Sequence, residues 1–468
     1  MTTYHIGMVG LGVMGRNLVL NMVNHGFSVA GFVRDPKKAS QFREQTAGLP
    51  VQVYGGWADF VGALEIPRRI MMMVPAGAPV DAVINELQPH LAAGDVLIDG
   101  GNSHFTDTIR RGQVLEQAGI RYIGTGVSGG EEGALYGPCI MPGGQPEAYR
   151  AVEPILTSIA AKVNGEPCCA YMGSGAAGHF VKTVHNGIEY GIMQLICETY
   201  DFLHRGLELA TPAIRDLFAS WNQAEMNSYL MEITVLVLSK RDPETGRPLV
   251  DLILDHAEQK GTGKWTAQSA LDLGVPVPTL TSAVEARILS GLRDERLKAS
   301  AILPGPAGAG DMAGASLTDS VRKALYLGML ACYAQGMALL REASREHGFG
   351  LSYATIARIW RGGCIIRAHM LESIHEALTR EPDLPNLLLS PVFAREVAGG
   401  QEALRQIVAA AASSGIPMIC SAATLAYYDS YRSARLPANI LQAQRDHFGA
   451  HTYRRLDREG VFHTNWTE

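Results

Sequence analysis

The glycine-rich run GLGVMG, residues 10–15, constrains the fold most, because it directly follows the apolar run YHIGMVG, residues 4–10. Residues 16–25 have helical composition, so the glycines stand at a strand-to-helix turn. Glycines at this spacing permit a tight turn and let a pyrophosphate approach the unpaired N–H groups of a helix N-terminus. A glycine-rich turn without a ligand is the alternative. The predicted dinucleotide contacts are Gly10, Gly12, Val13, Met14 and Gly15.

The first 175 residues alternate short β-rich runs with helical segments. This pattern predicts a mostly parallel sheet with helices on both faces, that is, an α/β Rossmann-type doubly wound domain over residues 1–175. Eight runs are expected as strands: YHIGMVG (4–10), FSVAGFV (27–33), VQVY (51–54), RIMMMVP (69–75), DVLIDGG (95–101), RYIGTGV (121–127), CIMPGG (139–144) and CCAYMG (168–173).

From residue 176 the chain shows long helical periods, broken at RDPETGRP, GVPVP, LPGPAGAG and EPDLP. Strand-like runs almost vanish, so we predict a large all-α domain over residues 176–435. Residues 436–468 are too few for a domain and form a short C-terminal tail.

The helical part contains a weak internal echo at a spacing of about 140 residues. HFVKTVHNGIEYGIMQLICETYDFL resembles SVRKALYLGMLACYAQGMALL, and a tryptophan follows each segment. An internal helical duplication would explain this, because two copies packed together bury faces that neither buries alone. Chance similarity between Ala-rich and Leu-rich helices is the alternative.

Composition and charge exclude several classes of function. A net charge of −6 and a pI near 6.2 disfavour nucleic acid as the main partner. Seven cysteines, an odd number without a C-x-x-C pair, argue against a disulfide framework or a zinc ribbon. We find neither a signal peptide nor a run of roughly 18 uninterrupted apolar residues, so we expect a soluble, cytoplasmic protein without a membrane partner.

The end of the second predicted strand reads Phe32-Val33-Arg34-Asp35 and bears on the choice of coenzyme. An acidic residue at the strand end would bind the ribose hydroxyl of NAD, whereas an arginine accommodates the 2′-phosphate of NADP. Val33 occupies the strand-terminal position and Arg34 follows it, which favours NADP. Asp35 stands next to Arg34 and leaves NAD open.

Two more glycine-rich loops follow predicted strands, DGGNS at 99–103 and GVSGGEEGA at 126–134. Open α/β sheets bind ligands at the carboxyl ends of their strands, so both loops are expected at the ligand cleft. They offer neutral donors suited to a carboxylate or a polyol, although ordinary turns would look similar. The candidates are Asn102, Ser128, Gly129 and Gly130.

The segment KTVHNGIEY, residues 182–190, places its polar residues on one face of an apolar helix. Their positions are i, i+3, i+4, i+7 and i+8, the spacing that normally faces a core. We interpret this stripe as facing a wet internal cleft, in which a desolvated Lys182 acts as a base and a protonated Glu189 as an acid. A charge pair between the two is the structural alternative. His185, Asn186 and Tyr190 complete the stripe.

Further cations are dispersed along the chain, and each alone is typical of a surface charge. A single bound phosphate, which needs several charge-assisted donors, would explain why the chain carries all of these cations. His447 and His451 are four residues apart but lack a H-E-x-x-H glutamate and a third ligand nearby, so no metal site is expected. The candidate phosphate ligands are Lys260, Arg287, Arg445 and His451.

Taken together, these motifs resemble the decarboxylating 6-phosphogluconate dehydrogenase family from the first strand to the last residues. The resemblance is carried, in order, by GLGVMG, DGGNSHFTDTIRR, GVSGGEEGA, KTVHNGIEYG, KGTGKW, RKALY with YAQG, WRGGCIIR, LPANILQAQRDHFGAHTY and FHTNW. It implies NADP-dependent oxidative decarboxylation of 6-phospho-D-gluconate to ribulose 5-phosphate and carbon dioxide, as in the pentose phosphate pathway.

The resemblance also implies roles for residues. Lys182 would take the C3 hydroxyl proton and then polarise the ketone, and Glu189 would protonate C1 of the enediol. The helical domain would bind substrate and form a homodimer, with the tail reaching the neighbouring subunit's active site. The sugar acid would contact Asn102, Ser128, Gly129, Gly130, His185 and Asn186, and the phosphate would contact Tyr190, Lys260, Arg287, Arg445 and His451.

The chain departs from the family pattern near the coenzyme. The family commonly has asparagine where Val33 stands and a small hydroxyl residue where Asp35 stands. The familiar V-K-A-G turn is V-P-A-G here, so Pro75 replaces a lysine between Val74 and Ala76. Asn102 is expected near the coenzyme as well as the substrate. One lost cation and one gained anion predict a weakened preference for NADP.

Two other functions would share part of the pattern. A β-hydroxyacid dehydrogenase that does not decarboxylate would share the Rossmann domain and a helix-borne lysine, but its substrate would lack the distal phosphate. A non-catalytic NADP-binding scaffold would have little reason to keep both Lys182 and Glu189 on one face.

Overall fold

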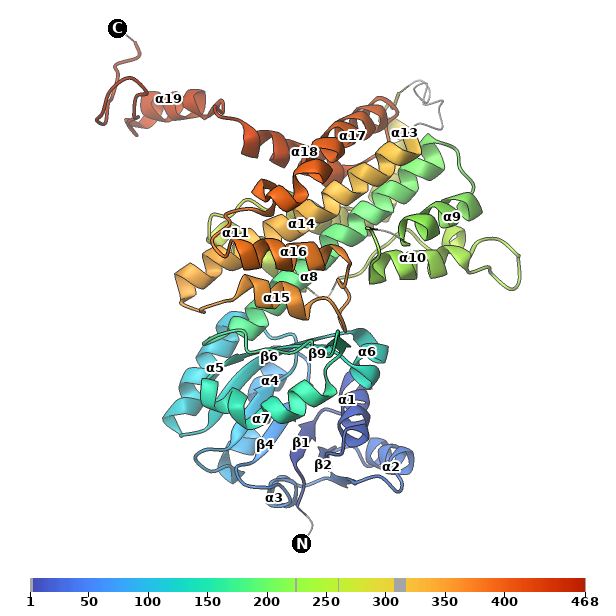
Figure 1. Ribbon diagram of the computed structural model, residues 1–468, viewed down its shortest axis with the longest axis vertical. Coiled ribbons are helices and arrows are strands. Elements are labelled where there is room, and N and C mark those ends of the chain that lie inside the picture. The colour runs from blue at the N-terminus through green and yellow to red at the C-terminus, as the bar shows by residue number, and fades with distance from the viewer. Residues whose placement is uncertain (1–2, 224, 260, 307–316, 468) are drawn as a thin grey trace.

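The computed structural model describes residues 3–223, 225–259, 261–306 and 317–467. An N-terminal parallel-sheet Rossmann-like domain is followed by a large helical domain, which confirms the predicted fold class (Figure 1). The final helix, α19 (Ala438–Gly449), stands away from the rest of the molecule in this view.

The main sheet has seven strands in the order β3-β2-β1-β4-β5-β6-β7. The first six are parallel and β7 runs antiparallel to β6. The order reverses between β1 and β4, where open α/β sheets bind their ligands. The strands are β1 (Ile6–Val9), β2 (Val29–Phe32), β3 (Val51–Tyr54), β4 (Arg69–Met72), β5 (Val96–Asp99), β6 (Arg121–Ser128) and β7 (Cys139–Gly144).

The eighth predicted strand is wrong. Residues 168–173, all of them described, form no strand and make only scattered hydrogen bonds beside β7, with one bridge between Cys169 and Ile140. The run is apolar because Cys168 and Met172 pack in the core of the helical domain and Cys169 packs under the sheet. Just before it, β8 (Lys162–Val163) and β9 (Glu166–Pro167) form a separate two-stranded hairpin.

Helices cover both faces of the sheet, because its central strands are apolar on both sides. One apolar cluster joins the sheet to α1, α2 and α7, and a second joins it to α3, α4 and α5. The helices of this domain are α1 (Val13–Asn24), α2 (Pro36–Gln45), α3 (Trp57–Gly62), α4 (Ala78–Leu87), α5 (Phe105–Gln117), α6 (Gly130–Tyr136) and α7 (Pro146–Ile159).

Two long helices, α8 (Ala177–Asp201) and α14 (Leu317–His347), pack antiparallel at the centre of the helical domain (Figure 1). A Cβ on Gly191 would lie 2.7 Å from the Cys332 sulfur, and one on Gly328 would lie 2.9 Å from Leu195. Glycines therefore allow the close contact. By length and composition α14 is apolar enough to cross a membrane, but 89% of its apolar window is buried inside the protein.

The remaining helices surround this central pair. They are α9 (Thr211–Trp221), α10 (Tyr229–Ser239), α11 (Thr262–Asp272), α12 (Pro278–Gly291), α13 (Arg293–Ile302), α15 (Tyr353–Ile359), α16 (Met370–Arg380), α17 (Ala394–Ser413) and α18 (Ile419–Arg432).

Contacts between the two similar halves of the helical domain support an internal duplication. Ser228 and Ala368, which are 140 positions apart, form a β-bridge with each other. The N–H of Tyr229 donates to the carbonyl of Arg367, and the N–H of His369 donates to the carbonyl of Asn227. Positions one repeat apart thus meet each other, as they do where two similar units pack about an approximate twofold axis.

The tail folds around one buried carboxylate, that of Asp446. It accepts hydrogen bonds from the backbone N–H groups of Thr452 and Thr464, from the Trp466 indole and from the His463 ring at 2.9–3.0 Å. These bonds outweigh burial and lower the pKa of Asp446 to about 2. The chain after α19 is therefore held against the helix.

Candidate active site

Close packing between α8 and the sheet positions the catalytic candidates. A Cβ on Gly126 of β6 would lie 2.5 Å from Cβ of Lys182, and one on Gly178 would lie 2.2 Å from the carbonyl oxygen of Gly124. Because these positions carry no side chain, the first turns of α8 lie directly on β6. Lys182 is thereby held beside the carboxyl end of the strand that carries Ser128.

A cavity of about 470 Å³ lies at this junction and brings most of the predicted substrate residues together. It is lined by Asn102 from the β5–α5 loop, by the Ser128 loop, by the polar stripe of α8, and by Arg287 from α12. The lining residues include Met14, Asn102, Ser128, Gly129, Gly130, Lys182, Asn186, Glu189, Tyr190 and Arg287.

Burial moves the pKa values of the two catalytic candidates in opposite directions. It lowers the pKa of Lys182, which is 6% exposed, although the nearby Glu189 carboxylate opposes the shift. It raises the pKa of Glu189 despite the opposing charges of Lys182 and Arg287. Desolvation therefore favours the neutral form of both groups, a free amine and a protonated carboxyl.

A chain of hydrogen bonds fixes the orientation of Lys182. Its Nζ donates to Oδ1 of Asn186 at 2.7 Å, and Nδ1 of His185 lies 3.2 Å from the same oxygen. Nδ1 also lies 3.4 Å from Nζ of Lys182, and Nε2 lies 3.1 Å from the Ser128 hydroxyl oxygen. The N–H of Ile365 donates to the same hydroxyl at 3.4 Å.

His185 lies behind the cavity and is fully buried. Burial and then the charge of Lys182 hold the pKa of His185 well below its usual value. The ring is therefore neutral near pH 7 and connects Ser128 to Asn186 without adding a second cation beside Lys182.

Tyr190 and Arg287 form the end of the cavity away from the sheet. The Arg287 guanidinium carbon lies 3.5 Å from the centre of the Tyr190 ring, a cation–π contact. Gly263 lets the Tyr190 ring pack closely, since a Cβ there would lie 2.5 Å from it. Lys260 lies outside the described residues. A cation and a phenol hydroxyl at this end suit an anion.

The loop with Asn102 is supported by a buried network around Asp99, at the end of β5. Asp99 accepts from the hydroxyls of Ser103 at 2.6 Å and Tyr122 at 3.0 Å. The buried guanidinium of Arg111 lies 3.5 Å from the same carboxylate and binds Asp81 on α4. These bonds hold the loop against the sheet and were not predicted, because nothing in their spacing marks them.

A second cavity, of about 800 Å³, lies over the first βα turn at the carboxyl end of the sheet. Gly10 has φ of +95°, and a Cβ there would lie 2.4 Å from the Met73 carbonyl oxygen. A Cβ on Gly12 would meet no atom within 4 Å, so this glycine faces open space. The turn therefore leaves a backbone cradle that fits a pyrophosphate at the N-terminus of α1.

Several predicted coenzyme residues line this second cavity: Gly10, Gly12, Val13, Val33, Arg34, Asp35, Val74 and Pro75. Met14 and Asn102 line the first cavity instead, and neither Gly15 nor Ala76 is among the lining residues of these two cavities. Arg16 and Lys38 also line the second cavity and were not predicted. Both supply cations to the cavity that Pro75 also lines.

Asp35 has a structural role that its position in the sequence does not reveal. Its carboxylate accepts from the backbone N–H groups of Lys37 at 2.9 Å and Lys38 at 3.4 Å. It therefore caps the N-terminus of α2, and Pro36 occupies the first position of that helix. Its charge is directed to the helix and not to Arg34.

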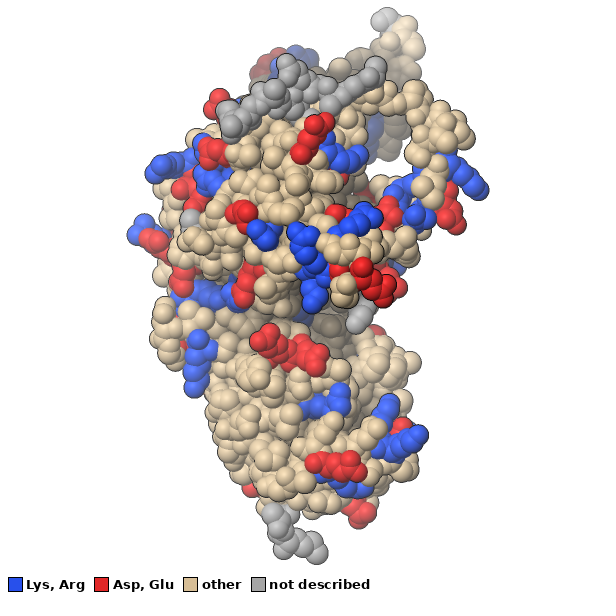
Figure 2. Space-filling view, turned by 90° about the vertical axis from the view of Figure 1, so that its right-hand side faces the viewer, with Lys and Arg blue, Asp and Glu red and all other residues tan. Residues whose placement is uncertain are grey.

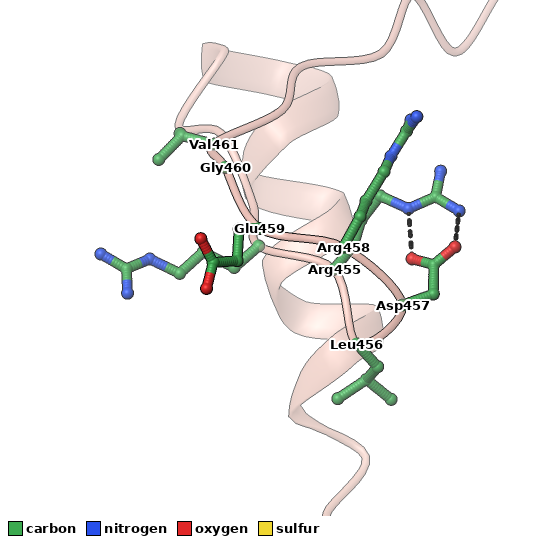
Figure 3. Close-up of a pocket in the computed structure, with 8 residues that line it drawn as sticks. Arg455, Leu456, Asp457, Arg458, Glu459, Gly460 and Val461 are labelled. Carbon is green, nitrogen blue, oxygen red and sulfur yellow. Dashed lines mark hydrogen bonds and ion pairs between the residues drawn. The ribbon is translucent and has the colours of Figure 1, made fainter.

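Arg445 and His451 lie in the tail and do not line the cavity of Lys182 within this chain. Arg445 donates to the Gln442 amide oxygen at 3.0 Å, and the His451 ring contacts Phe448. The loop that follows, residues 454–461, encloses a shallow hollow of its own, in which Arg455 pairs with Asp457 (Figure 3). That hollow holds no counterpart of the Lys182 and Glu189 pair.

Charges elsewhere on the surface are mixed. On the face in Figure 2, Lys and Arg side chains alternate with Asp and Glu over the helical part, and no broad basic area forms. Among the described residues, no three His, Cys, Asp or Glu side chains are grouped so that they could hold a metal ion.

Comparison with known proteins identifies the family. The family model described as NAD binding domain of 6-phosphogluconate dehydrogenase matches residues 5–173, and that described as 6-phosphogluconate dehydrogenase, C-terminal domain, matches residues 178–466. The chain is 53% identical over 467 residues to the NADP(+)-dependent, decarboxylating 6-phosphogluconate dehydrogenase of Bacillus subtilis, with both chains fully covered. It is also 53% identical over 471 residues, again with full coverage of both, to the decarboxylating enzyme of Escherichia coli K12.

A solved structure agrees with the sequence comparisons. Plasmodium falciparum 6-phosphogluconate dehydrogenase, studied in its apo form, with NADP+ and with 6-phosphogluconate, superposes with a TM-score of 0.96 at 40% identity. The match covers 99% of this chain and 100% of that one. With its glycine cradle, its cavity and its polar stripe on α8, this chain belongs to the 6-phosphogluconate dehydrogenase family.

Proposed function

We propose that this protein oxidises and decarboxylates 6-phospho-D-gluconate to D-ribulose 5-phosphate and carbon dioxide, with NADP as coenzyme. The observation that carries the proposal is the pair of Lys182 and Glu189 in one cavity, with pKa values that burial shifts in opposite directions. A base and an acid poised in this way suit a reaction that first removes and later returns a proton.

Lys182 acts first, as the base. With its pKa lowered by burial it is partly a free amine, and it takes the proton of the C3 hydroxyl. The Gly10–Gly15 turn and Arg34 would hold NADP, which would supply the hydride acceptor for C3. The bond to Asn186 keeps the amine aimed at the cavity during this step.

The protonated Lys182 then polarises the new C3 ketone. A carboxylate that is β to a ketone loses carbon dioxide readily once the carbonyl oxygen is stabilised, because the electrons that leave the broken bond are delocalised onto that oxygen. A positioned ammonium beside the carbonyl oxygen serves this purpose. The neutral His185 leaves that charge concentrated at Lys182.

Glu189 completes the reaction by protonating C1 of the enediol that remains. Its raised pKa keeps a larger share of the carboxyl protonated near neutral pH. Lys182 and Glu189 are two turns apart on α8, so the reacting carbon would lie between them.

The other cavity residues bind the substrate. Asn102, Ser128, Gly129, Gly130, His185 and Asn186 serve the sugar acid, directly or by orienting one another. Tyr190 and Arg287 bind the phosphate together with Lys260, Arg445 and His451.

Residues 1–175 bind the dinucleotide, and residues 176–435 bind substrate and dimerise. Residues 436–468 reach the partner, so that Arg445 and His451 complete the partner's site. The tail stands off its own body and exposes Ile440, Leu441 and Phe448, which suits packing on a second copy. We place this homodimer in the cytoplasm.

The test is to incubate the protein with 6-phosphogluconate and NADP and to follow NADPH and carbon dioxide together. We expect the two products in equal amounts. NADPH without carbon dioxide would instead indicate a dehydrogenase that does not decarboxylate, and neither product would indicate a binding protein. A 6-phosphogluconate-free reaction is the control.

A further inference from the structure

An acidic residue of α4, Glu86, reaches across the coenzyme cavity to the guanidinium of Arg34. The two side chains form an ion pair, and the Trp57 indole N–H donates to the same carboxylate at 2.8 Å. Trp57 is itself fixed by stacking on Phe32, with ring centres 3.5 Å apart. All four residues line the cavity.

Glu86 occupies a position at which its charge does not stabilise its own helix. It stands in the last turn of α4, which ends at Leu87, where the helix dipole disfavours a negative charge. The side chain is 39% exposed and that of Arg34 is 60% exposed, so the pair lies within reach of a ligand.

Asp35 does not compete for the same guanidinium, because it caps α2 through the N–H groups of Lys37 and Lys38. Among the described residues that line this cavity, Asp35 and Glu86 are the carboxylates. Glu86 is therefore the anion that meets Arg34.

We propose that Glu86 is a specificity-determining residue that opposes the 2′-phosphate of NADP and leaves NAD nearly unaffected. A 2′-phosphate that binds Arg34 must displace the carboxylate or share one guanidinium with it, and two anions at one cation repel each other. The ribose of NAD carries a neutral hydroxyl there and does not face this cost. Arg16 and Lys38 line the same cavity and keep NADP binding favourable. The inference rests on the proposed coenzyme site around Gly10 and Arg34.

The test is calorimetric titration of the coenzyme-free protein with NADP and separately with NAD, for the wild type and for Glu86→Gln. Glutamine keeps the shape and can still accept from Trp57, but it removes the charge. We expect the Kd for NADP to fall roughly three- to tenfold, while the Kd for NAD changes less than about twofold. Glu44→Gln, an exposed change of equal charge on α2, is the matched control and should change neither.

A double-mutant cycle with Arg34→Met tests the mechanism. Without the guanidinium, Glu86→Gln should lose most of its selective effect on NADP. The proposal is overturned if Glu86→Gln leaves the Kd for NADP unchanged, if it alters NADP and NAD equally, or if the Arg34→Met background preserves the full effect. The titration needs no substrate, so a protein that binds NADP but fails to oxidise 6-phosphogluconate would count against the proposed function alone.

Discussion

Lys182 and Glu189 share a cavity and nearly a helical face, and the same burial that lowers the pKa of the amine raises the pKa of the carboxyl. Each group is shifted toward its uncharged form, which is the form in which an amine accepts a proton and a carboxyl group donates one. The buried environment of the cavity therefore suits the proposed base and the proposed acid even without substrate.

The first prediction at this scale concerns pH. Turnover needs Lys182 deprotonated and Glu189 protonated, so kcat should fall at low pH as Lys182 gains a proton and at high pH as Glu189 loses one. Glu189→Gln should lower kcat about 10²- to 10⁴-fold and abolish the fall at high pH while keeping the fall at low pH. Steady-state rates of both proteins across a pH series measure this.

A matched variant makes the pH result specific. Glu258→Gln changes the other described carboxylate that lines the cavity, and it should keep both limbs of the profile. If Glu189→Gln kept its alkaline limb, the acid would have to be another group.

At the residue scale, the sequence predicts which side chains lie together where one element carries the whole pattern. Lys182, Asn186, Glu189 and Tyr190 follow one another at helical spacing, and the structure brings them together in one cavity. The pair of Arg34 and Glu86 joins the loop after β2 to α4, and no local sequence pattern marks it. The helix-capping role of Asp35 was not predicted either, because its position after Arg34 drew attention to the coenzyme and not to the next helix.

At the scale of elements, the contact between α8 and β6 depends on glycines that look unremarkable in the sequence. The spacing of apolar residues predicted α8 and seven of the strands, since periodicity reports which faces are buried. It failed at residues 168–173, because a buried irregular segment is as apolar as a buried strand. The close approach of helix to sheet was not predictable, since it depends on which glycines face each other.

We predict that Gly178→Ala weakens this contact. The new Cβ would lie 2.2 Å from the Gly124 carbonyl oxygen and 2.3 Å from that of Met141, and backbone atoms cannot move aside easily. The expected cost is about 1–3 kcal/mol, seen as a lower midpoint of thermal unfolding, with a fall in kcat because Lys182 lies one turn away. Gly399→Ala on the exposed face of α17, where a Cβ meets nothing within 4 Å, should raise the midpoint slightly. Equal midpoints for the two variants would show that the contact adapts.

At the scale of the whole molecule, the order of domains followed from the change near residue 176 from alternating strand and helix patterns to long helical patterns. The first long helix, α8, begins at Ala177. The tail is different, because its short sequence says little about where it lies. In this structure it projects from the body, and the predicted phosphate ligands Arg445 and His451 lie on it (Figure 1).

Shared active sites predict complementation between inactive variants. If the proposed roles hold, Lys182→Met removes the base from its own site. Arg445→Ala then removes a phosphate ligand from the partner's site, and it should raise KM for 6-phosphogluconate far more than it changes coenzyme binding. Dimers that combine one subunit of each kind hold one intact site. After unfolding and refolding an equal mixture, we expect roughly a quarter of wild-type activity at low substrate concentration.

The two variants refolded separately are the controls and should stay inactive under the same conditions. A mixture no more active than its components would contradict shared sites and place Arg445 outside the reaction. The same assay with Arg458→Ala, a change in the hollow of Figure 3, should leave activity near the wild-type level.

The carboxylate of Asp446 gives the tail a property that a free peptide arm would lack. Because four donors converge on this one group, residues 452–466 are already folded onto α19 before they meet another surface. A preformed arm loses little conformational freedom when it docks, whereas a disordered arm must be ordered at that moment. In the proposed dimer, the tail would therefore dock on a partner as one small rigid body, and assembly would need no folding step of its own.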